Sequence, residues 1–201
     1  MLVQGIKSRP VYTGLAVDPH AQRHLFALEG EGALAFTDAL AQADRKFLAT
    51  AEILYVPTGS RAANHELQLA ATGPFDLWTA PSIPVLLNRL RVTLHTAAMG
   101  TRLYIAGTEG FIGEAMQVAL DEAIDFNSVL TEHRGSSARR VQCVHCKGIT
   151  EDVITSPFTC SHCGLALLVR DHYSRRLGAF QGVNIDAEEP GTAPGPELMF
   201  P

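Results

Sequence analysis

The four cysteines of this 201-residue chain stand in two pairs, Cys143-Val-His-Cys146 and Cys160-Ser-His-Cys163, with thirteen residues between the pairs. A Cys-x-x-Cys pair places two thiolates on one tight turn, and two such turns supply the four sulfurs of a tetrahedral metal site. Four protein ligands leave no open position for water, so the pattern predicts a structural rather than a catalytic ion. We therefore predict that Cys143, Cys146, Cys160 and Cys163 bind one metal ion.

Zinc is the metal that we expect, with iron in a rubredoxin-like site as the alternative, because both accept four sulfurs in tetrahedral geometry. A third interpretation is a pair of disulfides or a redox dithiol. Disulfides need an oxidising compartment, whereas no hydrophobic signal segment follows Met1, so we expect a cytoplasmic protein. His145 and His162 stand between the ligands and are expected at the surface, because four sulfurs already complete the coordination shell.

The composition is compatible with a folded protein, since hydrophobic residues make up 46% of the chain and charged residues 18%. No apolar run approaches the ~20 residues that a membrane helix needs, so no membrane partner is expected. Residues 134–176 hold seven Lys/Arg and three Asp/Glu, whereas residues 1–133 hold nine and fourteen. A basic segment in an acidic chain favours an acidic protein partner or a polyanion near the cysteines; the alternative is a solvated surface.

Predicted strands and helices alternate before the cysteines, which indicates an α/β fold with a parallel sheet covered on both faces. The predicted strands are 11–17, 24–28, 53–56, 67–70, 102–106 and 128–132, and the predicted helices are 33–43, 82–98 and a third that follows Gly110 and ends near residue 124. We divide the chain into an α/β domain (1–133), a four-cysteine module (134–187) and a flexible tail (188–201), the last because it is rich in proline and acidic residues.

The order of elements and glycine turns in residues 23–132 resembles the pyridine-nucleotide domain of ferredoxin reductase-like flavoproteins. In that family the first strand ends in a Gly-Gly-x-Gly-x-Thr-Pro turn that meets the pyrophosphate, and a later strand ends in Cys-Gly-Pro-x-x-Phe. The corresponding stretches here are Leu28-Glu-Gly-Glu-Gly-Ala-Leu34, without the Thr-Pro pair, and Ala106-Gly-Thr-Glu-Gly-Phe111, without the cysteine. The resemblance implies a degenerate Rossmann-like domain. Its possible vestigial cofactor-binding residues are Gly30, Gly32, Gly107 and Phe111.

The first glycine turn also carries two carboxylates. If a nucleotide were bound, Glu29 and Glu31 would face its phosphates. An anion site relies on uncrowded backbone N–H groups at a helix N-terminus, and neighbouring carboxylates oppose that attraction. NAD(P) binding is therefore not expected, and the glycines are interpreted as turn glycines.

Three further segments follow the cysteines, namely Pro157-Phe158, Arg170-Asp-His-Tyr-Ser-Arg-Arg176 and Gly178-Ala-Phe-Gln-Gly182. Together with the cysteine pairs they resemble the small, DmmA-like subunit of bacterial dimethylamine monooxygenase. In that family the heme oxygenase and the NADPH-flavin-iron–sulfur reductase lie on other chains. The resemblance implies a non-catalytic accessory, assembly or electron-transfer-supporting subunit of a heme-dependent complex that demethylates dimethylamine oxidatively.

The basic segment suggests where other subunits would bind. The expected partner-docking residues are Arg170, His172, Tyr173, Arg175 and Arg176, because arginine forms bidentate pairs with carboxylates and tyrosine adds a rigid apolar face. A charged hairpin end that touches nothing is the alternative.

The sequence favours an accessory role over other functions. No catalytic residue is expected, because adjacent residues such as Asp171, His172 and Ser174 do not point at one another as a catalytic triad does. One alternative function is an electron carrier or an NAD(P)H-binding reductase component. The other is a nucleic-acid-binding zinc ribbon, which the net charge of −5 disfavours.

Overall fold

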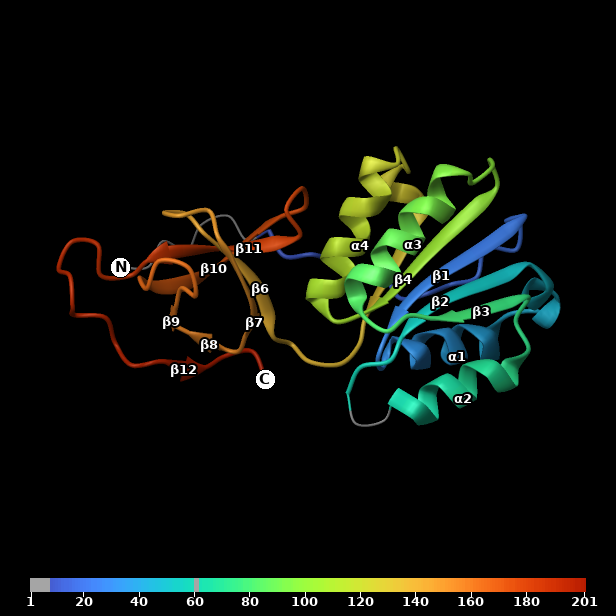
Figure 1. Ribbon diagram of the computed structural model, residues 1–201, viewed down its shortest axis with the longest axis horizontal. Coiled ribbons are helices and arrows are strands. Elements are labelled where there is room, and N and C mark those ends of the chain that lie inside the picture. Colours follow the sequence, from blue (N-terminus) through green and yellow to red (C-terminus); the bar gives the residue numbers. More distant parts are fainter. Residues whose placement is uncertain (1–7, 60–61) are drawn as a thin grey trace. The chain divides into compact units, whose positions relative to one another are not determined.

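A computed structural model describes residues 8–59 and 62–201 of the chain (Figure 1). The chain divides into two units. The α/β unit runs from residue 12 to residue 135, and the four-cysteine unit combines residues 8–11 with residues 136–201. Within the described residues, no helix has both the length and the apolar character needed to cross a membrane.

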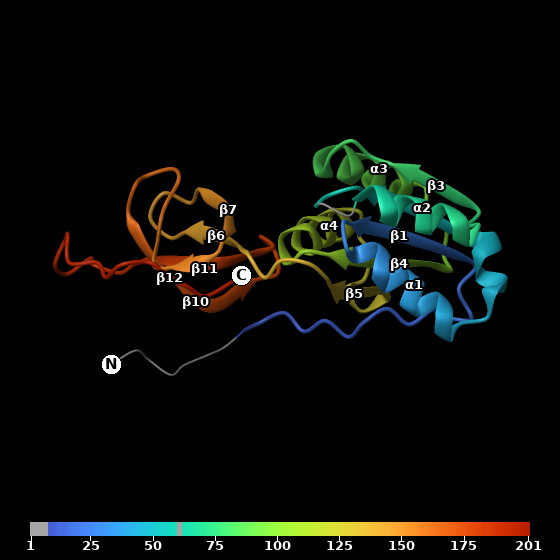
Figure 2. The same ribbon diagram turned by 90° about the horizontal axis from the view of Figure 1, so that it is seen from below.

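The sheet of the α/β unit contains five parallel strands in the order β3-β2-β1-β4-β5. Figure 2 shows β1 and β4 side by side, with β5 beyond β4. The strands are β1 (Arg23–Glu29), β2 (Ala51–Val56), β3 (Asp76–Thr79), β4 (Thr101–Gly107) and β5 (Val129–His133). The helices are α1 (Gly32–Gln42), α2 (Ala62–Thr72), α3 (Ile83–His95) and α4 (Glu109–Asp121), with short 3-10 helices η1 (Arg45–Thr50) and η2 (Phe126–Ser128). The predicted parallel α/β fold is confirmed.

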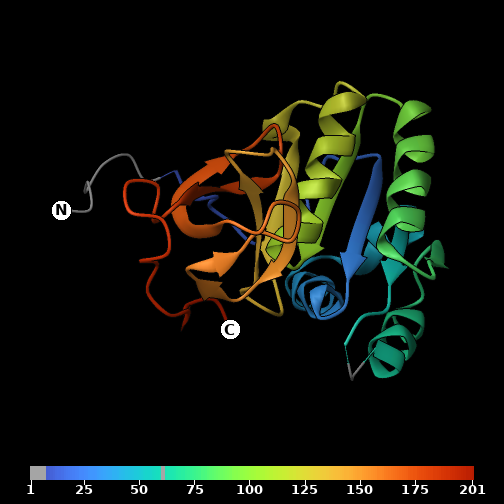
Figure 3. The same ribbon diagram turned by 60° about the vertical axis from the view of Figure 1, so that its left-hand side comes forward.

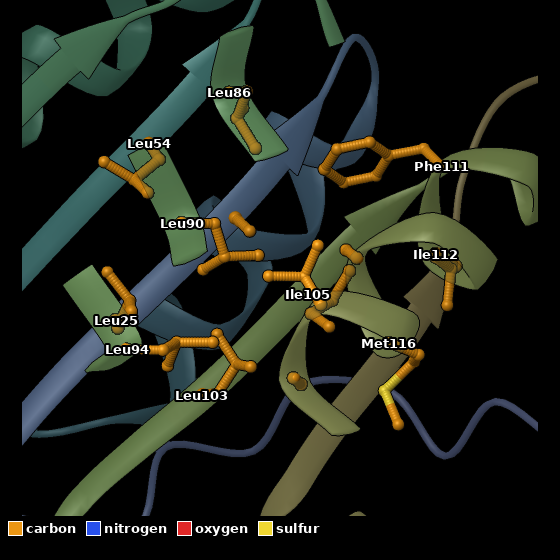
Figure 4. Close-up of a cluster of buried hydrophobic side chains, with 14 of the residues drawn as sticks. Leu25, Leu54, Leu86, Leu90, Leu94, Leu103, Ile105, Phe111, Ile112 and Met116 are labelled. Carbon is orange, nitrogen blue, oxygen red and sulfur yellow. The ribbon is translucent and has the colours of Figure 1, made fainter. Parts of the chain in front are cut away.

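Helices cover both faces of this sheet, with α3 and α4 on one face and α1 and α2 on the other (Figure 3). Side chains alternate between the two faces of a strand, so a strand buried on both faces is apolar along its whole length. In β1, Leu25 and Ala27 join the α3–α4 core, whereas Phe26 and Leu28 join the α1–α2 core. Figure 4 shows the first core, in which leucines of α3 face the strands beneath them.

The strand order reverses between β1 and β4. The helix that follows β1 (α1) covers one face, and the helix that follows β4 (α4) covers the opposite face. In open α/β sheets, such a switch point opens a crevice at the carboxyl ends of the two strands, and ligands bind there. The glycine turns singled out in the sequence lie at these two strand ends.

The four-cysteine unit is built from short strands. Its five-stranded sheet has the order β7-β6-β11-β10-β9, and a two-stranded sheet pairs β12 with β8 (Figure 1). The strands are β6 (Arg139–Cys143), β7 (Ile149–Val153), β8 (Thr155–Ser156), β9 (Phe158–Thr159), β10 (Ala166–Ser174), β11 (Ala179–Asn184) and β12 (Glu197–Leu198). The cysteine pairs lie at the β6–β7 turn and the β9–β10 turn.

Segments near both chain ends pack on this second unit. The backbone N–H of Ser8 donates to the carbonyl of Asp171 at 3.0 Å, and the N–H of Tyr173 donates to the carbonyl of Ser8 at 3.0 Å. At the other end, β12 pairs with β8 and Phe200 is buried. The boundary between the two units falls after residue 135, and residues 8–11 group with the second unit. The last residues of the chain include the paired strand β12 and the buried Phe200.

Candidate metal centre and docking hairpin

The four cysteine sulfurs converge on one point. All four lie within 4.8 Å of one another, and the Sγ atoms of Cys143 and Cys163 and those of Cys146 and Cys160 are each 3.8 Å apart. A tetrahedron of sulfurs about 2.3 Å from a central metal has edges of about 3.8 Å. The arrangement therefore fits one tetrahedral ion held by the two turns.

The two turns are built alike, although their sequences differ. In each, the residue four positions after the first cysteine donates its N–H to that cysteine's carbonyl at 3.0 Å, and the cysteine's own N–H donates to the carbonyl five residues on at 2.9 Å. The donating residues, Lys147 and Gly164, both have positive φ, at 63° and 76°. Such φ values favour glycine, and only the second turn has glycine at this position. The ammonium of Lys147 instead donates to the carbonyl of Val144 at 2.6 Å.

The pKa values of two of these thiols, Cys160 and Cys163, are shifted in opposite directions. Burial opposes ionisation of Cys160, but the N–H groups of His162 and Cys163 outweigh it and lower the pKa of Cys160 to about 6. For Cys163 the N–H of Leu165 favours the thiolate, yet burial and the three neighbouring sulfurs together raise its pKa to about 12. Four thiolates at these distances repel one another unless a metal ion neutralises them.

His162 supports the first turn from the second, although the sequence predicted only an exposed residue. Both His145 and His162 are exposed. The Nε2 of His162 lies 2.7 Å from the carbonyl oxygen of Ile149, which can only accept, so Nε2 carries the proton. A Cβ on Gly148 would lie 2.9 Å from Cβ of His162 and closer still to its ring. Glycine at 148 therefore lets the two turns approach each other.

Replacement of Gly148 by alanine should loosen the metal centre, because the added methyl group forces His162 and its turn away. Overpacking of this kind costs about 1–3 kcal/mol. The expected result is faster transfer of the bound metal to a chelator. The matched control is Gly195→Ala, where an added Cβ meets nothing within 4 Å, and metal transfer should stay at the wild-type rate. Equal rates in the two variants would contradict the contact.

The predicted docking residues lie together on the hairpin formed by β10 and β11, and we call residues 170–176 the arginine hairpin. Four of them are exposed, namely Arg170, His172, Arg175 and Arg176. Tyr173 is half-buried, and its ring meets Phe180 edge-on with centroids 5.0 Å apart. Much of the tyrosine therefore serves the unit's own core, and the exposed part of the hairpin is mainly basic.

Asp171 organises this hairpin, a role that no local sequence pattern indicates. Its Oδ1 accepts from Arg139 at 3.0 Å and its Oδ2 accepts from Arg9 at 2.6 Å. Although burial favours the neutral acid, these two guanidinium groups lower the pKa of Asp171. The guanidinium of Arg139 lies 4.0 Å from the ring centroids of both Phe180 and Phe200. These contacts join residues that are distant in sequence.

The glycines at the switch point of the α/β unit face the chain's own atoms. Gly30 has φ of +51°, and a Cβ there would lie 3.2 Å from the carbonyl oxygen of Thr58. A Cβ on Gly32 would lie 3.0 Å from the backbone nitrogen of Gly107 and closer still to the carbonyl before it. Phe111 is only 1% exposed and packs in the core between α3 and α4 (Figure 4). Glycine at positions 30 and 32 is thus required by close packing against the chain's own backbone.

Comparison with known proteins places the chain in a family. The family model described as the N-terminal domain of dimethylamine monooxygenase subunit DmmA-like proteins matches residues 4–129, and the corresponding C-terminal model matches residues 140–183. The chain belongs to the DmmA-like family. The resemblance found in the sequence is thereby confirmed.

One curated relative of this DmmA-like chain is the heme-dependent oxidative N-demethylase delta subunit of Ectopseudomonas mendocina (strain ymp). The two are 34% identical over 110 residues, which are 55% of this chain and 63% of the relative. The match therefore spans less than two thirds of the relative's own length.

Among solved structures, this DmmA-like chain is similar to the FAD/NAD-binding domain of nitric oxide dioxygenase from Vibrio cholerae. The TM-score is 0.43 at 16% identity, covering 61% of this chain and 55% of that one. The ferredoxin reductase in carbazole 1,9a-dioxygenase gives a TM-score of 0.39 at 13% identity, over 58% and 34% of the two chains.

Proposed function

We propose that this chain is a non-catalytic accessory subunit of a heme-dependent oxidative N-demethylase that acts on dimethylamine. The observation that carries the proposal is the match to a protein named as the delta subunit of such an enzyme, together with membership of the DmmA-like family. In this proposal, other chains of the complex carry the heme and the reductase centres. The four-sulfur cluster supports it, because a closed shell offers no position at which a substrate could react.

Zinc is the metal that we propose for the four-cysteine centre. Zinc has no redox chemistry, so a zinc centre would fix the shape of the unit without passing electrons. The sulfur geometry also accepts iron, and iron would support the alternative function of electron carrier. Absorption in the visible range that bleaches on reduction would favour that alternative, and its absence with stoichiometric zinc would favour the accessory role.

The α/β unit, in this proposal, is a scaffold rather than an NAD(P)H carrier. Its strand order provides the crevice that nucleotides use, but the glycine faces at that crevice meet protein atoms. A scaffold with a vestigial nucleotide crevice is consistent with a subunit whose redox centres lie on other chains.

The arginine hairpin is the surface that we propose for docking to another subunit. Arg170, Arg175 and Arg176 are exposed on one hairpin and give it a cluster of positive charge. An acidic surface on the partner would supply the complementary charge. Desolvated arginine–carboxylate pairs are among the contacts whose loss weakens an interface most.

Replacing Arg175 and Arg176 together by alanine should weaken assembly of the complex. The loss of each buried arginine–carboxylate pair costs roughly 2 kcal/mol of binding free energy, which corresponds to about a 30-fold loss of affinity for each arginine. The measurement is co-purification of tagged oxygenase and reductase chains with the variant, together with N-demethylase activity of the mixture. Metal content and thermal unfolding of the isolated variant should match the wild type.

The matched control removes the same charge elsewhere. Arg45 and Lys46 are exposed residues of η1 in the α/β unit, and the Arg45→Ala/Lys46→Ala variant also loses two positive charges. It should assemble normally. Equal loss of assembly in both variants would show that only net charge matters, and normal assembly of the hairpin variant would remove the docking role.

A further inference from the structure

At the switch point of the sheet, the side chain of Glu29, the last residue of β1, bonds to residues that follow β2 and β4. Its Oε2 accepts the backbone N–H of Thr108 at 2.8 Å, and its Oε1 accepts the hydroxyl of Thr58 at 2.6 Å. Glu29 is 6% exposed. Its carboxylate is therefore held inside the unit by donors from the ends of two other strands.

The position of this carboxylate is one where anions are favoured. Thr108 is the N-cap of the 13-residue helix α4, so its N–H belongs to the positive end of the helix dipole. Helix N-termini at a switch point bind phosphate groups of nucleotides through such N–H donors. A carboxylate, like a phosphate, offers negative charge and acceptor oxygens to such donors.

The backbone around Glu29 is shaped for this side chain. Gly107 has φ of +155°, and a Cβ there would lie 2.8 Å from both Cβ and Oε2 of Glu29. The backbone at Gly107 thus approaches Glu29 too closely for any residue other than glycine to fit without a shift. By contrast, an added Cβ on Gly59 or Gly73, in turns of the same unit, would meet nothing within 4 Å.

We propose that the carboxylate of Glu29 is an internal substitute for a bound anion and permanently fills the anion position at the switch point. The inference deepens the proposed scaffold role and names the residue responsible. It explains why a nucleotide-type sheet can be stable without a nucleotide: Glu29 satisfies the donors that a phosphate would otherwise satisfy. It also predicts that removing the carboxylate opens a site for a small anion.

The Glu29→Ala variant of the full chain tests this by chemical rescue. The substitution deletes CH2–COO⁻ and leaves the N–H of Thr108 and the hydroxyl of Thr58 without their acceptor. Acetate has the size and charge of the deleted group. Trp78, the only tryptophan, lies in the α/β unit, so its fluorescence reports the melting of that unit. We expect Glu29→Ala to melt at least about 5 °C below the wild type and acetate to restore most of that loss saturably.

Ionic strength is held constant with chloride. A difference between acetate and chloride then reports binding of acetate at the site and not a general effect of salt. Acetate should leave the wild type unchanged, and also the Glu31→Ala variant, whose exposed carboxylate lies two residues away. Inorganic phosphate, the second probe, should likewise stabilise only Glu29→Ala. Equal acetate responses in all three proteins would overturn the proposal.

Two further measurements keep the test decisive. If Glu29→Ala does not fold, the Glu29→Gln variant replaces it in the test. Glu29→Gln keeps the side-chain shape but loses the charge beside α4, so it should melt below the wild type. An unchanged melting temperature of Glu29→Gln would overturn the proposal. Saturable NADPH binding by the wild type in calorimetry would overturn both it and the scaffold role. These measurements use the isolated chain, so a failure of the assembly prediction leaves their outcome unaffected.

Discussion

Replacement of Cys160 by serine should release the metal ion and unfold the four-cysteine unit, while the α/β unit keeps its fold. Cys160 is 2% exposed, and its sulfur lies 3.8 Å from that of Cys146. Structural zinc contributes about 10–16 kcal/mol of apparent folding free energy in small zinc modules, far more than the short strands of this unit can supply alone. Metal analysis should fall from about one ion per chain to near zero. Hydrogen exchange of β6, β7, β9 and β10 should become fast.

The neighbouring residue provides the control. Ser161 is exposed and its hydroxyl lies 3.0 Å from that of Thr150, so Ser161→Ala should keep the metal. Fluorescence of Trp78 should show the same unfolding transition of the α/β unit in the wild type and both variants. A Cys160→Ser protein that retains stoichiometric metal and slow exchange would contradict the four-sulfur centre. Stoichiometric iron in the wild type, produced with zinc and iron both available, would replace zinc and favour electron transfer.

The convergence of the cysteines could be predicted because its determinants are local. Each Cys-x-x-Cys turn is formed by six consecutive residues. Because no cysteine is left over, the simplest arrangement is that all four cysteines bind one metal ion. The parallel α/β fold was predictable for a related reason. Strands β1, β2 and β4 are mostly buried, and each has a continuous apolar run in its middle, which is typical of a sheet covered on both faces.

The region between β2 and α3 was predicted wrongly. Residues 67–70, which precede Gly73-Pro74, were expected to form a strand. They lie instead in α2, where Leu69 is fully buried and Leu67 is 70% exposed. The actual next strand, β3, is a short edge strand whose residues are exposed or half-buried, so it lacks the continuous apolar run of a central strand.

The prediction of a strand at residues 11–17 failed for a different reason. This segment follows the edge of the sheet without forming a regular strand: the N–H of Gly14 donates to Thr131 at 3.2 Å and that of Leu15 donates to the Glu132 carboxylate at 2.8 Å. Pairing of Ser8 with Tyr173 and stacking of Phe200 on Arg139 likewise join segments more than sixty residues apart. Such contacts depend on the completed fold, and no local pattern in the sequence encodes them.

Replacement of Arg139 by alanine should destabilise the four-cysteine unit strongly, even though Arg139 lies outside the metal centre. The side chain is 8% exposed, it lies between Phe180 and Phe200, and its loss leaves a partly buried carboxylate with one partner fewer. Breaking a buried ion pair from one side costs roughly 3–5 kcal/mol. Hydrogen exchange of β10 and β11 in denaturant should report that loss, while Trp78 fluorescence stays at its wild-type midpoint.

Two substitutions separate the contributions of Arg139. Arg139→Lys keeps the charge but lacks the planar fork that stacks on both rings, so it should recover only part of the lost stability. Arg170→Ala removes an exposed arginine from β10 and should change the free energy of unfolding by less than about 0.5 kcal/mol. If Arg139→Ala is no more destabilising than Arg170→Ala, the sandwich between the two phenylalanines does not hold the C-terminal segment. If the effect is as large as expected, Arg139 stabilises the four-cysteine unit through its stacking between the two phenylalanines and its ion pair with Asp171, which Arg9 also contacts from a segment far away in the sequence.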